Sequence, residues 1–107
     1  MIIVSYDRSA LTLYVTGHAY TGQPGRDLVC AAATMLVCTL AADIERLAEV
    51  CPHSKKHIAL EPGKAELSLS APGAENTAAI VFDSLCSGFA LLAERYPGAV
   101  RLLLLRS

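Results

Sequence analysis

The stretch at residues 17–34 has the sequence GHAYTGQPGRDLVCAAAT and separates two different patterns. Before it, apolar and polar residues alternate, as in a β-strand with one buried face. After Leu28, apolar residues recur every three or four positions, as in an amphipathic helix. Three glycines and one proline in the stretch predict a connection with few steric limits on its backbone. The stretch therefore predicts a strand, a mobile loop and a helix in direct succession.

Two β-hairpins are predicted, one on each side of the first helix. The first consists of alternating runs at 2–6 and 10–15. In its second strand one face carries Leu11, Leu13 and Val15. The second hairpin consists of 57–60 and 65–70, and Pro62-Gly63 fits the two central positions of a type II turn between them.

One amphipathic helix is predicted after each hairpin. The first begins after Asp27, a suitable N-cap, and ends before Pro52. Its predicted apolar face consists of Val29, Ala33, Leu36, Leu40, Ile44 and Leu47. The second helix ends at Pro97-Gly98, and its predicted apolar face consists of Phe82, Leu85, Phe89, Leu92 and Tyr96. A last strand over 100–105 hardly alternates, so we expect it in the centre of the sheet.

The predicted order of elements is strand, strand, helix, strand, strand, helix, strand (ββαββαβ). Each helix has an apolar face that needs a sheet to cover, so we expect both helices on one face of a single sheet. The predicted fold class is α/β, a two-layer sandwich with a mixed or antiparallel sheet. We expect one domain over residues 1–107, and the other face of its sheet needs a partner or a polar surface.

Composition narrows the classes of function. Hydrophobic residues make up 53% of the 107 residues, enough for one core without crosslinks. The formal net charge is −1 and there is no basic cluster, so direct binding of nucleic acid is not indicated. Charged residues interrupt the apolar stretches and no basic leader precedes the first strand, so we expect no membrane span and no targeting segment. We predict a cytoplasmic protein whose four cysteines are reduced.

Cys30 is the leading candidate for a chemical role. With Asp27 as N-cap it falls in the first helical turn, where free backbone N–H groups and the positive end of the helix favour a thiolate. The alternative is that Cys30 is a small buried hydrophobic residue, the usual place of a cytosolic cysteine. The helix start favours the reactive interpretation, because a structural cysteine does not need that position.

His18 is the candidate base, since it leaves the predicted strand where the loop begins. If that strand lies beside the first helix, the imidazole can take the proton of Cys30 and return it to a leaving amine. The alternative is a surface histidine at a strand end. Asp27 also has two interpretations: it caps the helix through the backbone N–H of Val29 or Cys30, or it orients His18 as the third member of a triad.

Other polar residues carry weaker signals. Thr34 lies one helical turn beyond Cys30, so its hydroxyl either meets the sulfur or a substrate, or bonds back to its own helix. Cys38, one turn further, is interpreted as packing, with a second reactive thiol as the alternative. The paired spacing of a structural zinc site is absent from Cys51, His53 and His57. No phosphate-binding Gly-x-x-x-x-Gly-Lys motif occurs either, so we expect no metal and no cofactor.

Two short segments resemble the motifs of the Prp family of ribosomal-processing cysteine proteases. They are Gly17-His18-Ala19 and Gly25-x-Asp27-Leu28-Val29-Cys30-Ala31-Ala32. The family has a Gly-His-Ala motif, a glycine-containing loop and an Asp-Ile-Val-Cys-Ala-Ala motif that opens a helix. The length of the chain and the order of its elements are similar to those of the family over the whole sequence.

The resemblance implies a small α/β cysteine protease with Cys30 as nucleophile and His18 as its base. Asp27 matches the acidic residue of the family before the helix. A mobile loop over 20–26 would cover the substrate, and the glycines of this region are Gly17, Gly22 and Gly25. The implied substrate is the precursor of bacterial large-subunit ribosomal protein twenty-seven, whose N-terminal extension ends in aromatic residues. The implied assembly is a homodimer.

The sequence departs from the family pattern at three places. Leu28 replaces the more usual isoleucine, which is a mild change. Ala33-Thr34 stands where family members often have valine and serine, and the threonine keeps the hydroxyl. Pro24 stiffens the loop beside Gly25.

Two other classes of function stay open from the sequence. A non-catalytic ribosome-assembly or protein-binding module needs the same sheet and helices but neither thiol nor imidazole. A thiol redox protein would use Cys30 with Cys38, although the chain has no Cys-x-x-Cys motif. The presence of both Cys30 and His18 favours peptide-bond hydrolysis, with backbone N–H groups at the helix start as oxyanion donors. An apolar groove that accepts an aromatic side chain would then give specificity.

Overall fold

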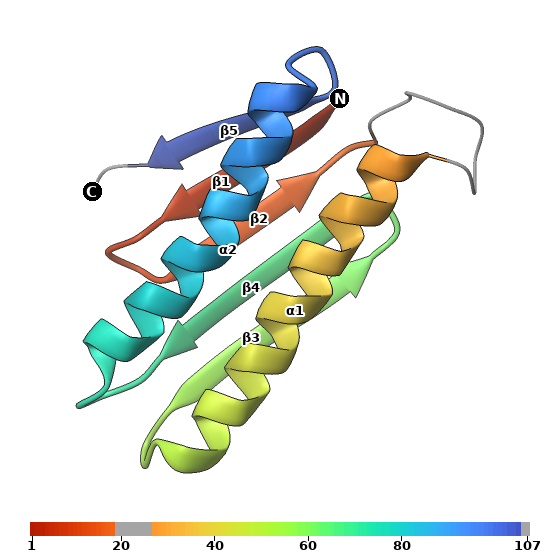
Figure 1. Ribbon diagram of the computed structural model, residues 1–107. Coiled ribbons are helices and arrows are strands. Elements are labelled where there is room, and N and C mark those ends of the chain that lie inside the picture. The colour runs from red at the N-terminus through yellow and green to blue at the C-terminus, as the bar shows by residue number, and fades with distance from the viewer. Residues whose placement is uncertain (19–26, 106–107) are drawn as a thin grey trace.

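The computed structural model describes residues 1–18 and 27–105. Two helices cover one face of a five-stranded sheet, as Figure 1 shows. The elements in chain order are β1 (Ile2–Asp7), β2 (Thr12–Thr16), α1 (Leu28–Val50), β3 (Lys55–Glu61), β4 (Lys64–Ser70), α2 (Glu75–Arg95) and β5 (Val100–Leu105). The predicted ββαββαβ order and the two-layer α/β fold are confirmed.

The sheet is mixed, with strand order β3-β4-β2-β1-β5. β5 runs parallel to β1, and the other neighbouring strands are antiparallel. The prediction of β5 as a central strand is therefore wrong, because β5 lies at an edge. The exposed fraction of its side chains rises along the strand, from 2% at Val100 to 65% at Leu104. The continuous apolar run thus reflects an exposed strand end, and not burial on both faces.

The core lies between the helices and the inner face of the sheet. Alternating strand residues supply that face, including Val4, Leu13 and Leu67, and each of these is fully buried. The predicted apolar face of α1 is confirmed at Val29, Ala33, Leu40 and Ile44. Val37 is buried with them, although the sequence pattern did not assign it to this face.

Leu36, also part of the predicted stripe, is partly buried against the core and contacts the second helix. A Cβ on Gly88 of α2 would lie 2.6 Å from Cδ2 of Leu36. The two helices therefore approach closely at this glycine, and Leu36 fills the space that a side chain there would need.

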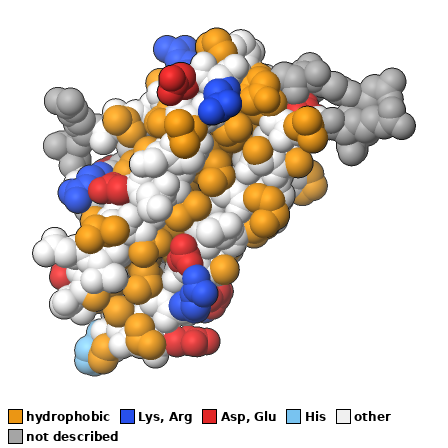
Figure 2. Space-filling view, in the orientation of Figure 1, with side chains coloured by type: hydrophobic (Ala, Val, Ile, Leu, Met, Phe, Trp, Pro, Cys, Tyr) orange, Lys and Arg blue, Asp and Glu red, His pale blue; other side chains and the backbone are white. Residues whose placement is uncertain are grey.

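Both helices are long and apolar enough to cross a membrane when only length and composition are considered. One or two such helices are weak evidence of a membrane span, because the core helix of a soluble protein and a signal sequence have the same length and composition. One face of each helix packs against the sheet. Figure 2, which looks onto the helices, shows apolar side chains exposed along both of them with small groups of charged side chains between.

Candidate active site

Three segments that are distant in sequence meet at one end of the molecule. They are the end of β2, the start of α1 and the turn between β3 and β4 (Figure 1). The pairing of β2 with β4 produces this arrangement, since Thr16 lies opposite Lys64 at the last step of the ladder. The backbone N–H of Gly17 then donates to the carbonyl oxygen of Gly63, at 2.9 Å. The segment before His18 is thereby attached to the β3–β4 turn.

A cavity of about 160 Å³ opens at this end of the molecule. Its walls are mainly apolar, and their side chains come from Ile2, Val15, Ala33, Val37, Leu60 and Ala65. Helix α1 adds Cys30, Thr34 and Cys38 along one side. Glu61 and Lys64, which pair across the hairpin, bring opposite charges to the wall. The cavity therefore suits an apolar group that lies against the thiol of Cys30.

The start of α1 is capped as predicted. Oδ1 of Asp27 accepts hydrogen bonds from the backbone N–H groups of Val29 and Cys30, each at 3.0 Å. Asp27 has extended backbone angles, with φ −78° and ψ 103°, which is the usual conformation of an N-cap. The cap fixes Cys30 in the first helical turn, where its side chain is half-buried and lines the cavity.

His18 is exposed and follows Gly17 directly. Its imidazole lies against the β3–β4 turn, because a Cβ built on Gly63 would be 2.8 Å from Nε2 of His18. Gly63 thus touches the imidazole and also lines the cavity with Cys30. His18 therefore contacts a residue of the cavity that Cys30 lines, whereas their pairing as base and nucleophile stays a prediction, as does the orientation of His18 by Asp27.

The remaining predicted site residues have different outcomes. The hydroxyl of Thr34 donates to the carbonyl oxygen of Cys30 at 2.8 Å, so it bonds back to its own helix while it also lines the cavity. Gly17, expected in the mobile substrate loop, is attached to Gly63 and has a φ of +93°. Gly22 and Gly25, and the loop predicted over 20–26, lie outside the described residues.

A disulfide between Cys30 and Cys38 is excluded by helix geometry. The two residues are eight positions apart on α1, so the helical rise separates their Cα atoms by about 12 Å. A disulfide requires Cα atoms within about 7 Å of each other. The intramolecular redox function that the sequence left open is therefore wrong.

His53 and His57 do not line this cavity. Nε2 of His57 lies 3.7 Å from Oε1 of Glu66, which is a partly exposed pair on neighbouring strands. Within residues 1–18 and 27–105, no group of three or more His, Cys, Asp and Glu side chains is placed to hold a metal ion.

The sequence did not predict that the β3–β4 turn takes part in the site. The Pro62-Gly63 dipeptide predicted the turn itself, and the φ of +74° at Gly63 agrees with its type II form. Nothing local in the sequence indicated that this turn would meet His18. That contact depends on the pairing of β2 with β4, which joins residues about fifty positions apart.

Comparisons with known proteins identify a family and a shared fold. A family model described as cysteine protease Prp matches residues 1–101. A comparison with curated proteins finds no match.

Solved structures with the same fold include Prp from S. aureus, an essential ribosomal processing protease, in complex with a covalently linked product peptide. That chain is 20% identical, the alignment covers 98% of this chain and 100% of that one, and the TM-score is 0.76. The same S. aureus protease with a substrate peptide is 19% identical over 98% and 100% of the two chains, with a TM-score of 0.71. A Streptococcus mutans protein is 24% identical over 99% and 93%, also with a TM-score of 0.71.

Proposed function

We propose that this chain, which belongs to the cysteine protease Prp family, removes the N-terminal extension of bacterial large-subunit ribosomal protein twenty-seven. Cys30 is the nucleophile and His18 is the general base. The observation that supports this most is the position of Gly63, which touches the imidazole of His18 and lines one cavity with the thiol of Cys30. The S. aureus relatives were solved with substrate and product peptides, which supports a peptide as the ligand of this site.

The proposed reaction has two steps. His18 accepts the proton of the Cys30 thiol, and the sulfur attacks the carbonyl carbon of the scissile bond. The imidazolium then gives the proton to the leaving amine as the C–N bond breaks, which leaves a thioester on Cys30. Water, deprotonated by His18, hydrolyses the thioester and restores the thiol.

The hydrogen bonds of Asp27 limit the choice of oxyanion donor. Asp27 already engages the backbone N–H groups of Val29 and Cys30, and the N–H of Ala31 donates to the carbonyl of Asp27. Asp27 does not engage the N–H of Leu28 in these hydrogen bonds, so we propose this group as an oxyanion donor at the helix start.

We expect the cavity beside Cys30 to bind an apolar side chain of the substrate next to the scissile bond. Its aliphatic walls, Ile2, Val15 and Val37 among them, offer dispersion contacts to a flat ring, in line with an extension that ends in aromatic residues. We also expect a homodimer, as the family resemblance implies, and a cytoplasmic location, as the sequence indicates.

A cleavage assay tests the proposal directly. A peptide that carries the extension and its junction is incubated with the native protein and with Cys30→Ser, His18→Ala and Cys51→Ser variants. Cys51→Ser is the matched control, because Cys51 is the C-cap of the same helix and does not line the cavity. We expect loss of at least about 10³-fold for Cys30→Ser and about 10²- to 10⁴-fold for His18→Ala, with Cys51→Ser close to native.

The outcomes of this assay separate the rival functions. Cleavage that survives Cys30→Ser would remove the proposed mechanism. Binding of the peptide without cleavage by the native protein would favour the non-catalytic module.

A further inference from the structure

The contact between Gly63 and His18 has an unusual geometry. The three atoms nearest to a Cβ on Gly63 all belong to the imidazole of His18, with Nε2 at 2.8 Å, Cε1 at 3.4 Å and Cδ2 at 3.6 Å. The nitrogen end of the ring therefore occupies the space that any other amino acid would fill with its side chain. The absence of a side chain at this turn position is what admits the ring.

The turn that presents Gly63 is held on both sides. Glu61 pairs with Lys64 across the hairpin, which leaves a two-residue connection. The carbonyl oxygen of Gly63 accepts the N–H of Gly17, the residue before His18, at 2.9 Å. The backbone before His18 and the β3–β4 turn that its ring contacts are thus joined by a hydrogen bond. The contact with Gly63 limits where the ring can lie relative to the turn.

We propose that Gly63 is a positioning residue for His18, which fixes where the imidazole lies relative to Cys30. This inference rests on the proposed function, in which His18 is the base. Gly63 does not touch the reacting atoms in the proposed steps. Its part is to leave the space for the ring and to stop the ring from moving further toward the turn.

Displacement of the ring has different consequences for folding and for proton transfer. With a methyl group on Gly63, the ring must move by at least about 0.6 Å for the 2.8 Å separation to reach 3.4 Å, where ordinary van der Waals contact begins. The atoms that must give way are the far end of an exposed side chain and not backbone, so we expect the ring to move and the fold to be kept. Proton transfer from a thiol needs hydrogen-bond reach, and a misplacement of about 1 Å can reduce the rate by about 10²-fold.

Gly73 provides a matched control for Gly63. Both glycines lie in turns with positive φ, +74° at Gly63 and +84° at Gly73, so an alanine is similarly strained at either position. A Cβ at Gly73 meets no atom within 4 Å, and the residue lies before α2, outside the cavity beside Cys30. Gly63→Ala and Gly73→Ala therefore share the backbone strain and differ in the contact with His18.

The experiment compares these two variants by three measurements. We expect similar decreases in melting temperature for both. We expect kcat for the extension peptide to fall by about 10- to 100-fold in Gly63→Ala, with a smaller change in KM, and to stay near native in Gly73→Ala. The ring signals of His18 in NMR spectra, followed through a pH titration, should shift in Gly63→Ala only.

Each result has a defined meaning. Equal kcat in the two variants would overturn the proposal, and so would shifted His18 signals with native kcat. Native protein that cleaves nothing would overturn the proposed function and with it the catalytic part of this inference, while unchanged His18 signals in Gly63→Ala would refute the contact itself. If alanine prevents folding, Gly63→Asn and Gly73→Asn give the same comparison, because asparagine tolerates positive φ.

Discussion

At the scale of single residues, two glycines beside the candidate site are required for different reasons. A Cβ on Gly17 would lie 2.1 Å from the carbonyl oxygen of Met1, which is backbone and cannot turn away as a side chain can. A Cβ on Gly63 would meet only the end of the His18 side chain. Substitution at Gly17 should therefore affect folding first, and substitution at Gly63 should affect activity first.

Gly17→Ala is predicted to lower the free energy of unfolding by at least about 2 kcal/mol. The positive φ of +93° adds backbone strain to the overlap with Met1. Gly98→Ala is the control, because no atom lies within 4 Å of its Cβ position and its backbone is not in the left-handed region. Urea unfolding of both variants measures the difference, and equal stability would show that the Met1 contact does not constrain Gly17.

At the scale of elements, the start of α1 is the feature on which the site depends most. The sequence predicted it from Asp27 and the apolar period, and both are local signals that the structure confirms. The edge position of β5 and the contact of Leu36 with α2 were not predicted. Those features depend on which elements pack together, and local periodicity does not contain that information.

Replacement of Asp27 separates its two interpretations. Asp27→Ala should lower the free energy of unfolding by about 1 kcal/mol, because the N–H groups of Val29 and Cys30 lose their acceptor. Asp27→Asn keeps a capping oxygen and should stay within about 0.5 kcal/mol of the native protein in thermal or urea unfolding.

The activity of Asp27→Asn then tests the second interpretation, that Asp27 orients His18. Native kcat in this variant would show that Asp27 acts only as the helix cap. A loss of kcat at native stability would support the orientation of His18 by the carboxylate. An unstable Asp27→Asn variant would contradict the assignment of the cap to Oδ1.

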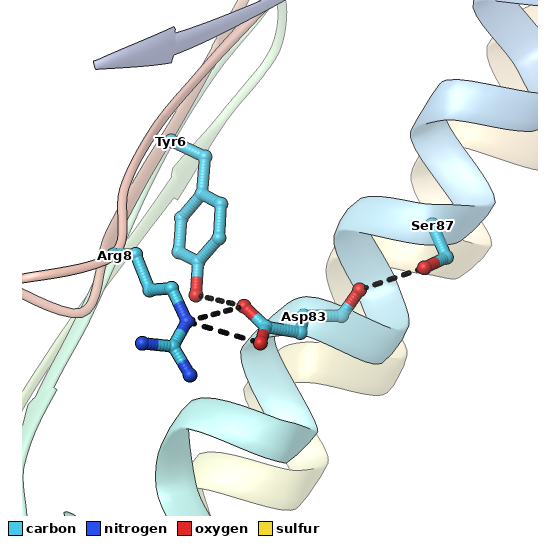
Figure 3. A network of polar contacts seen from close by, with 4 residues as sticks. All are labelled: Tyr6, Arg8, Asp83 and Ser87. Atoms are coloured by element: carbon cyan, nitrogen blue, oxygen red, sulfur yellow. Dashed lines mark hydrogen bonds and ion pairs between the residues drawn. The ribbon is translucent and has the colours of Figure 1, made fainter. Parts of the chain in front are cut away.

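At the scale of the whole molecule, a polar network at the other side of the fold joins sheet and helix (Figure 3). The hydroxyl of Tyr6 on β1 donates to Oδ1 of Asp83 on α2 at 2.8 Å, and Nε of Arg8 donates to the same carboxylate at 3.1 and 3.3 Å. The ring of Tyr6 also stacks on Phe82, with centroids 6.2 Å apart. The network therefore links stability to the protonation of Tyr6.

Stability is predicted to fall at alkaline pH. Burial, and then the hydrogen bond to Asp83, raise the pKa of Tyr6 above its ordinary value, and burial raises the pKa of the Cys86 thiol. The unfolded chain therefore loses these protons first, at about pH 8.5 for cysteine and about pH 10 for tyrosine, and stability decreases as pH rises beyond each value. Both residues lie outside the candidate site, so this decline is a property of the fold.

The variant Tyr6→Phe isolates the contribution of the tyrosine. At neutral pH it should be less stable than the native protein by about 1 kcal/mol, and this difference should shrink above about pH 10. Tyr14→Phe is the control, because Tyr14 is exposed and its hydroxyl has no hydrogen bond to the described residues. Urea unfolding across this pH range measures both, and a difference that stays constant with pH would contradict the account.

The parts of the fold that depend on local sequence signals could be predicted. The hairpins, the two helices and their common side of the sheet follow from alternation, helical spacing and turn residues such as Pro62-Gly63. The cavity beside Cys30 was not predictable in the same way, since its walls come from β1, β2, α1 and the β3–β4 hairpin. Gly63 could be recognised as a turn residue from the sequence, but its contact with His18 required the assembled sheet.

The nucleophile can be identified by a peptide chloromethyl ketone that carries the sequence of the extension. The reagent binds as substrate and alkylates the thiol that attacks the scissile carbonyl. Intact-mass measurement followed by peptide mapping should find one equivalent, attached to Cys30, with cleavage lost in proportion. Labelling of Cys38 in its place, or cleavage that continues when Cys30 is fully labelled, would contradict the assignment of Cys30 as the nucleophile.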